Sequence, residues 1–379
     1  MKILIVNQHA NNFGDEAAGT AVVNNLLKNK KIDCIEILYC MPGFLPVEDK
    51  RVIHNHELNV RNFRKRQFWQ YVLTRKATGS FLPKFIKKIC ENDVVLVSPC
   101  GANLGIYQDW HLLMQDIVVA LNKSPLIFHL NTISPSKSKF FDFLVIQMCK
   151  KAKVYVREKA SYNYLHMNGV NAVLGTDSAF SLESKGKVTV HENRIVFVPS
   201  DLWKWHKDFL GKDSDIFDTC ILEPLIDFAR SYDMEICILP HLNTPEEEAF
   251  NDSIMKKAIQ LIPDIKISIL KTKSCYEYEN YIRSSYMVVG MRYHSIIFSC
   301  KNCIPFVALS YEQKMIEVSQ YSRQIDNCID IMALNEPKQM TKKLEVVYNS
   351  HDRIVGELKA RKNDIVKKSL IVIEENFDK

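Results

Sequence analysis

The chain has 379 residues, of which 47% are hydrophobic and 25% charged. This length indicates two domains or one large one, and the near-average composition excludes disordered, collagenous and low-complexity classes. The net charge of +6, from 50 Lys and Arg against 44 Asp and Glu, is too small for the whole protein to be a nucleic-acid binder.

The N-terminal apolar run leads directly into polar Asn7, Gln8 and His9 rather than into a cleavage site, so we expect no secretory signal. No window of the sequence approaches the ~20 apolar residues of a membrane span. The eleven cysteines are irregularly spaced, which favours reduced thiols in a cytoplasmic protein. Cys300 and Cys303 have no second pair and no His cluster at zinc-ligand spacing, so we expect no metal site.

Ten short apolar runs, most of them alternating with amphipathic stretches, predict parallel strands covered by helices on both faces. Residues 181–193 are polar and interrupt the series, which predicts Rossmann-like domains over 1–182 and 194–335. From Pro337 onward, apolar residues at helical spacing predict a helical tail over 336–379, which we expect to pack across both domains. The ten runs cover residues 3–6, 34–39, 94–98, 126–130, 154–156, 195–198, 236–239, 265–270, 287–289 and 306–309.

Ligands of parallel α/β sheets bind beyond the carboxyl ends of the strands, so the residues after each run are the first candidates. After the first run, Gly14 permits a tight turn, and Asp15 opens the next helix. Asp15 either accepts a proton from a substrate hydroxyl or only caps the helix. Because the segment is not a GxGxxG, it gives little support for a nicotinamide site.

Two further segments carry polar or charged residues at strand ends. In SPCGANLGIYQDWH, residues 98–111, Gly101 and Gly105 would let a ligand approach the main-chain amides, and His111 either faces the site or lies on the surface. Arg157 directly follows an apolar run, which suits a bidentate grip on a carboxylate or phosphate. An ion pair of Arg157 with Glu158 or Asp177 is the alternative.

The strongest candidate follows the ninth run, in VVGMRYH. There the strand ends in Gly290, and Arg292 and His294 stand at the start of a helix. A helix N-terminus adds free amides and a positive dipole end to the arginine, which predicts an anion site. His294 could add a proton donor that titrates near neutral pH. The alternative is that both are solvated loop residues.

Several segments share their order and residue types with one known family. They are NFGDE at 12–16, GANLG at 101–105 with His111, NTISP at 131–135, REKAS at 157–161, TDSAF at 176–180, LPH at 239–241, and GMRYH at 290–294 followed by PFVALSYEQK at 305–314. Together they resemble the polysaccharide pyruvyl transferase family over about residues 3 to 320. The chain departs from that pattern at Cys100 and Ala102 in a usual triple Gly, at Ser134 in a usual Gly-Pro, and at Ser178 in a usual Asp-Pro.

The resemblance implies an α/β, GT-B-like fold, in which two Rossmann-like domains have parallel sheets facing across a cleft. It also implies a transferase that moves pyruvate from phosphoenolpyruvate (PEP) onto a sugar diol as a ketal, releasing phosphate, in bacterial surface or capsular polysaccharide biosynthesis. PEP is then a co-substrate, and no cofactor is expected. A nucleotide-sugar glycosyltransferase of GT-B fold and a non-catalytic polysaccharide-assembly subunit are the alternatives.

The chemistry of this reaction assigns roles to the candidate residues. The two anionic groups of PEP need cations, which Arg157 and Arg292 would supply from opposite domains. His294 is the expected acid for C3 of PEP, His111 is second, and Asp15 is the expected base for the acceptor. The expected PEP-binding residues are Arg157, Arg292, His294, Gly290 and Ser295, with the C-terminal domain as the PEP side. The expected acceptor-binding residues, in the N-terminal domain, are Asn12, Gly14, Asp15, Asn103 and His111. Further candidates are Asn131, Asp177, His241, Tyr311 and Lys314.

The positive charge is concentrated in one stretch, residues 50–92, within a basic insertion at 41–92. This stretch holds eleven Lys or Arg against Glu57 and Glu91, a net +9 that leaves −3 for the rest of the chain. Basic and aromatic residues on one helix are typical of a segment on an anionic bilayer. The expectation is peripheral contact with the inner membrane face, a lipid-linked oligosaccharide acceptor and no nucleic acid; the alternative is a solvated basic face with core aromatics. The aromatics are Phe63, Phe68, Trp69, Tyr71, Phe81 and Phe85.

Overall fold

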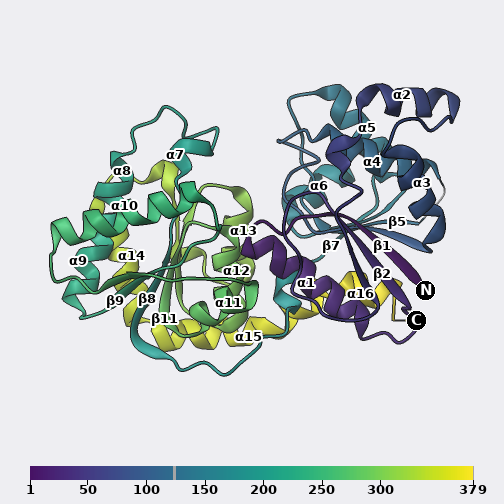
Figure 1. Cartoon of the computed structure of the whole chain (residues 1–379). Coiled ribbons are helices and arrows are strands. Elements are labelled where there is room, and N and C mark those ends of the chain that lie inside the picture. Colours follow the sequence, from purple (N-terminus) through teal and green to yellow (C-terminus); the bar gives the residue numbers. More distant parts are fainter. Residues whose placement is uncertain (123–124, 379) are drawn as a thin grey trace. The chain divides into compact units, whose positions relative to one another are not determined.

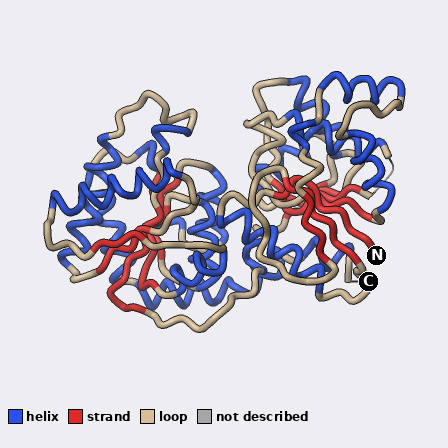
Figure 2. The backbone as a smooth tube through the Cα atoms, in the orientation of Figure 1, coloured by secondary structure: helices blue, strands red, loops and turns tan. Residues whose placement is uncertain are grey.

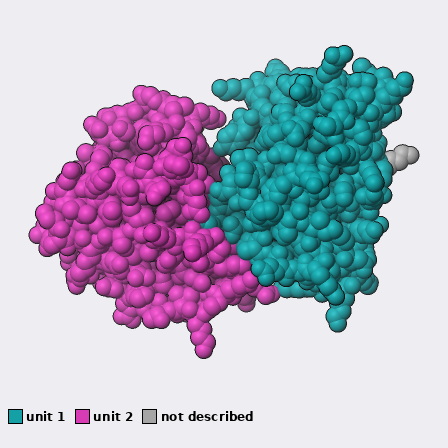
Figure 3. Space-filling view, in the orientation of Figure 1, with its two compact units in different colours: residues 1–182, 365–379 teal, residues 183–364 magenta. Residues whose placement is uncertain are grey.

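A computed structural model describes residues 1–122 and 125–378. The chain divides into two compact units, one formed by Met1–Leu182 with Ile365–Lys379 and the other by Glu183–Asp364 (Figure 3). In each unit a parallel sheet lies in the interior with helices on both sides (Figures 1 and 2). Two Rossmann-like units with parallel sheets were predicted from the sequence, and the structure confirms them.

The first unit has a seven-stranded sheet in the order β3-β2-β1-β4-β5-β6-β7. Residues of β1 alternate between the two faces, so that Leu4 packs in one apolar core and Ile3 and Ile5 in another. The elements are β1 (Lys2–Gln8), α1 (Phe13–Leu27), β2 (Cys34–Tyr39), β3 (Val52–Asn55), α2 (Lys65–Thr74), α3 (Leu82–Glu91), β4 (Val94–Val97), α4 (Trp110–Leu121), β5 (Leu126–Asn131), α5 (Lys139–Cys149), β6 (Lys153–Val156), α6 (Lys159–Met167) and β7 (Ala172–Leu174).

The second unit has a six-stranded sheet in the order β10-β9-β8-β11-β12-β13. Its central pair is parallel and in register from Met287 opposite Ile195 to Gly290 opposite Val198. The elements are β8 (His191–Val198), α7 (Leu202–Trp205), α8 (Asp215–Phe217), α9 (Glu223–Ser231), β9 (Glu235–Ile238), α10 (Pro245–Leu261), β10 (Ile267–Ile269), α11 (Cys275–Arg283), β11 (Ser285–Gly290), α12 (Tyr293–Asn302), β12 (Phe306–Ser310), α13 (Gln313–Tyr321) and β13 (Cys328–Asp330).

The C-terminal residues form the predicted helical tail, α14 (Pro337–Asn349), α15 (His351–Ser369) and α16 (Ile371–Asn376). The tail begins in the second unit, and its last residues belong to the first. There Thr176 donates a hydrogen bond to the carbonyl of Ile365 at 2.7 Å, and Tyr155 donates to Glu375 at 2.7 Å. The tail therefore contributes to both units.

The basic segment contains the short strand β3 and the helices α2 and α3. Five of its six aromatic side chains are buried, all except Trp69, which is 38% exposed. Phe63 and Phe81 stack at 5.3 Å between ring centroids, and Phe81 and Phe85 at 5.2 Å. Most of these aromatics therefore belong to the apolar core of the first unit, as in the alternative interpretation of this segment.

Candidate functional site

The second unit gathers polar residues at the carboxyl edge of its sheet. Strands β9 and β10 lie on one side of β8, and β11, β12 and β13 on the other, so the strand order reverses between β8 and β11. Ligands of open α/β sheets bind at such a switch point. Ser200, just after β8, is 1% exposed, and its hydroxyl has no partner in the described part of the chain.

The N-terminus of α12 follows β11 directly at this point. Arg292 is its N-cap, and His294, which is 6% exposed, lies in its first turn. Ser295 donates both its hydroxyl and its amide to the carbonyl of Arg292, at 2.5 and 3.0 Å. A Cβ on Gly290 would stand 2.3 Å from Oγ of Ser295, so a larger residue here would force that side chain to shift. Gly290 and Ser295 thus shape the turn, and their contact with PEP stays a prediction.

Arg292 is held in place by Glu247, a buried residue of α10. Nη2 of Arg292 donates a hydrogen bond to Oε2 of Glu247 at 2.8 Å. Oε1 of the same carboxylate accepts hydrogen bonds from the main-chain amides of His241 and Leu242 at 2.5 and 2.9 Å. The guanidinium also lies over the ring of Trp205, 5.5 Å from its centroid. Nε of Arg292 is buried and has no partner among the described residues.

Lys314, Glu312 and His206 form a second charged group after β12. Nζ of Lys314 lies 2.5 Å from Oε2 of Glu312, whose Oε1 lies 3.7 Å from Nε2 of His206. Although burial alone raises the pKa of Glu312, Lys314 and His206 lower it to about 2. Burial, together with the charge of Glu312, raises the pKa of neighbouring Tyr311. Tyr311 and Lys314, both predicted candidates, therefore lie in the same group.

His241 and His294 stack with ring centroids 6.1 Å apart. Burial lowers the pKa of His241 well below its usual value, and Arg292, His294 and Lys314 lower it further through their charges. His241 is therefore neutral at physiological pH. The structure thus brings together four predicted residues, His241, His294, Arg292 and Lys314, around the N-terminus of α12.

In the first unit, Asn12 and Asp15 pair at the start of α1. Oδ1 of Asn12 accepts the amide of Asp15 at 2.8 Å, and Nδ2 of Asn12 donates to the carboxylate at 2.7 Å. Asn12 is therefore the helix cap, and the alternative that Asp15 caps the helix is wrong. Gly14 lies inside the first helical turn of α1, so the tight turn expected at this glycine is absent. A positive φ, of 62°, occurs instead at Asn7.

A polar group that includes His9 lies near this helix start. Nε2 of His9 is 3.4 Å from Nδ2 of Asn103. Burial lowers the pKa of His9, while the nearby carboxylate of Asp15 opposes this shift. His111 is the second residue of α4, and its buried Nδ1 has no partner in the described part of the chain. Asp109 caps α4 and pairs with Arg61 of the basic segment at 2.8 Å.

Arg157, Asp177 and Asn131 lie deeper in the first unit. Nη1 of Arg157 donates to Asp177 at 2.7 Å, and the exposed fractions of the two side chains are 2% and 0%. This is one of the two ion pairs that the sequence left open, and PEP binding by Arg157 stays a prediction. Nδ2 of Asn131 donates to the carbonyl of Ser98 at 2.8 Å. A Cβ on Gly105 would lie 2.2 Å from Oγ of Ser134, so tight packing accounts for this glycine.

The sequence was also compared with known families and structures. Residues 12–313 match the family described as polysaccharide pyruvyl transferase. The chain belongs to this family. The match begins at the cap of α1 and ends at the start of α13, so it includes Asp15, Arg292 and His294 and leaves out the helical tail. His9 and Lys314 lie just outside its two ends. None of the curated proteins searched matches the chain.

The fold of this pyruvyl transferase family member is shared with solved GT-B structures. UDP-GlcNAc 2-epimerase from Neisseria meningitidis, bound to UDP-GlcNAc, aligns with a TM-score of 0.61 and 11% identity over 99% of both chains. A glycosyltransferase from Rickettsia africae aligns with a TM-score of 0.60 and 14% identity, covering 99% of this chain and 98% of its own. At sequence identities this low, the structural alignments show the fold alone, and they confirm the predicted GT-B class.

The sequence did not single out some residues of the candidate site. Glu247 stands three residues after Thr244 in a T-x-x-E pattern that marks a helix start, but its contacts with Arg292 and His241 depend on the fold. Trp205 is the last residue of the short helix α7 after β8, and His206 follows it, so neither residue directly follows the strand and the sequence did not single them out. His9 directly follows β1, and its position alone could have identified it.

Proposed function

We propose that the chain transfers the pyruvyl group of PEP to two hydroxyls of a sugar in a surface polysaccharide. The observation that carries this proposal is the N-terminus of α12, where Arg292, His294, His241 and Lys314 gather. An anion there would meet the positive end of the α12 dipole, the guanidinium of Arg292 and the ammonium group of Lys314. The carboxylate and phosphate of PEP are anions of the kind that such a site binds.

The proposed reaction needs one acid and one base. A proton from His294 adds to C3 of PEP, while a sugar hydroxyl, deprotonated by Asp15, adds its oxygen to C2. The second hydroxyl then attacks C2, the C2–O bond to phosphate breaks, and its proton leaves with the phosphate. PEP and the diol thus give the ketal and inorganic phosphate. Asp15 releases its proton to solvent, and His294 takes one up from solvent, so both groups return to their starting state. Acid-base catalysis of this kind contributes about 10²- to 10⁴-fold.

The test is incubation of the purified protein with PEP and a panel of soluble and lipid-linked glycans. Phosphate release and product mass are measured together, and we expect one phosphate for each pyruvyl ketal formed. A nucleotide sugar that supports transfer while PEP does not would refute the proposal and favour a glycosyltransferase. PEP that neither reacts nor raises the melting temperature would favour a non-catalytic subunit.

We also propose that the first unit binds an anionic membrane surface, where a lipid-linked acceptor would be presented. No described helix has the length and apolar composition needed to cross a bilayer. However, α2 and α5 expose Trp69, Leu73, Phe140 and Phe143, here called the α2–α5 patch, with exposures of 38%, 81%, 54% and 56%. The helices α2 and α5 are neighbours in Figure 1, and Trp69 of α2 stacks on Phe140 of α5 with ring centroids 6.3 Å apart. Exposed cations on or beside these helices are Arg64, Lys65, Arg66, Lys137 and Lys139.

Exposed aromatic and aliphatic side chains beside cations are suited to an anionic bilayer. The test is co-sedimentation with phosphatidylcholine vesicles with and without phosphatidylglycerol. We expect binding that requires the anionic lipid, falls with salt, and is lost when Arg64, Lys65 and Arg66 become Gln. The control removes the same charge from exposed Lys359, Lys362 and Lys367 of α15. Equal losses in both triple variants would refute the assignment.

A further inference from the structure

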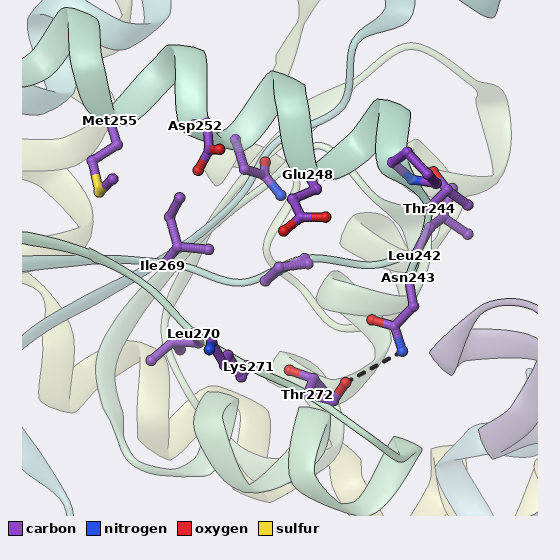
Figure 4. A pocket seen from close by; sticks show the side chains of 13 residues that line it. Leu242, Asn243, Thr244, Glu248, Asp252, Met255, Ile269, Leu270, Lys271 and Thr272 are labelled. Carbon is purple, nitrogen blue, oxygen red and sulfur yellow. Dashed lines mark hydrogen bonds between the residues drawn. The ribbon is translucent and has the colours of Figure 1, made fainter.

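The second unit contains a cavity of about 630 Å³ at the carboxyl ends of β9 and β10 (Figure 4). This volume is within the range of small-molecule sites. Glu248, Asp252 and Met255 of α10 line one wall, and the chain from Ile269 to Thr272 lines the opposite wall (Figure 4). The PEP site proposed above does not use these residues.

Two buried polar side chains of this cavity have no hydrogen bond within the described chain. Asn251 is 1% exposed, and both its Nδ2 and its Oδ1 have no partner there. Thr272 is 6% exposed, and the same holds for its Oγ1. Buried polar groups in native proteins are nearly always hydrogen-bonded, so these atoms indicate a ligand. A small side-chain rotation toward the cavity would break no hydrogen bond of these atoms.

The charges of the cavity disfavour an anionic ligand. Glu248 and Asp252 stand one helical turn apart, and only Lys271 opposes them in the lining. Carboxylates accept hydrogen bonds from hydroxyl groups but repel phosphate. Leu242 and Ile269 add apolar surface on which the C–H face of a ring can pack. The lining therefore suits a neutral ligand that carries several hydroxyls.

We propose that this cavity binds an N-acetylated sugar. The trans amide of an acetamido group points its N–H and its C=O in opposite directions. Oδ1 of Asn251, on the α10 wall, would accept the N–H, and the hydroxyl of Thr272, on the opposite wall, would donate to the C=O. Glu248 and Asp252 would accept sugar hydroxyls. That the sugar belongs to the polysaccharide acceptor rests on the proposed function, whereas binding of the sugar does not.

The loop between β9 and α10 connects this cavity to the proposed PEP site. Pro240 and Leu242 line the cavity, and His241 between them stacks on His294. Glu247 accepts the amides of both His241 and Leu242. The same short loop therefore contributes to both places, as expected if donor and acceptor bind beside each other.

The test is ligand-observed NMR titration of the full chain without PEP. We expect N-acetylglucosamine to bind about tenfold more tightly than glucose, because two hydrogen bonds distinguish them. Asn251→Leu, of similar volume, should abolish this preference without lowering the melting temperature, since an unpaired amide is removed from the interior. Thr272→Val should also reduce the preference. Gln260→Leu, at an exposed position of α10 outside the cavity lining, is the control and should keep it.

Equal affinity for the two sugars in the wild type would overturn the inference. So would an unchanged preference in Asn251→Leu or Thr272→Val, or displacement of the sugar by uridine diphosphate, since the carboxylates should exclude a phosphate. The outcomes also separate this inference from the proposed function. Pyruvyl transfer without any preference for the acetylated sugar refutes only the inference, whereas selective sugar binding without transfer from PEP refutes only the function.

Discussion

Replacing Arg292 with lysine tests the anion site most directly. In the structure, Nη2 of Arg292 is bonded to Glu247 at 2.8 Å, the guanidinium lies over Trp205, and Nε has no partner among the described residues. A lysine has a single nitrogen at its end, and the carboxylate of Glu247 would attract it. If PEP binds here as proposed, the variant should keep the ion pair and lose the N–H that would bind PEP.

The magnitude follows from the contacts that are lost. A hydrogen bond to a charged group contributes about 1.5–3 kcal/mol, which corresponds to roughly a 10- to 150-fold weaker affinity for PEP. Loss of the stacking on Trp205 costs the fold only about 0.5–1 kcal/mol. Affinity should therefore fall much more than stability. This contrast separates a binding role from a structural one.

Calorimetric titration with PEP and urea unfolding measure the two effects. Arg194→Lys is the matched control, because Arg194 pairs with Glu235 in the same sheet, at 3.3 Å, but earlier along its strand. The control should bind PEP as the wild type does. If Arg292→Lys binds PEP within about threefold of the wild type, the guanidinium is not the anion ligand and the reasoning fails.

The remaining predictions concern three buried residues. His294→Ala should lower turnover by about 10²- to 10⁴-fold while leaving PEP binding largely intact, and turnover preserved at saturating PEP would contradict the acid role. Glu247→Gln should lower the free energy of unfolding by about 3 kcal/mol, because it leaves Arg292 buried without its carboxylate; a change under about 0.5 kcal/mol in urea unfolding would exclude this. Burial raises the pKa of Asp116 well above its usual value, so the folded state keeps a proton that the unfolded state releases. Wild-type stability should fall by about 1.4 kcal/mol per pH unit as the pH rises from the unfolded pKa to the folded pKa of Asp116. Asp116→Asn should not show this fall, so it should gain stability relative to the wild type over the same range. Parallel stability curves in urea unfolding would show that Asp116 is already ionised.

The sequence predicted the interior of both sheets better than their edges. All ten predicted strands are present, while β3, β7 and β13 were missed. Each missed strand lies at an edge, where one flank is unpaired and a continuous apolar run is unnecessary. The segments VIHN and CID of β3 and β13 accordingly contain polar residues. The pattern of hydrophobic residues reports burial, and edge strands are not fully buried.

The sequence could predict those site residues that directly follow a strand. Arg292 and His294 follow β11 directly, so their position at the carboxyl edge could be inferred from the sequence. The partner of Arg157 could not be, because Glu158 and Asp177 were equally plausible until the fold brought Asp177 to 2.7 Å. Long-range pairs of this kind leave no periodic signal, so the sequence located the residues without identifying their contacts.

Glu247 shows why those contacts matter for the proposed function. If PEP binds at Arg292, it must share the guanidinium with a carboxylate that already accepts one of its hydrogen bonds and two main-chain amides. An anion that draws Arg292 away from Glu247 weakens the contact between α12 and the loop that carries His241 and Leu242. Leu242 also lines the cavity beside α10, so a ligand of that cavity would contact a residue whose amide is bonded to the same carboxylate. Occupancy of either place should therefore alter the other through Glu247, without any contact between the two ligands.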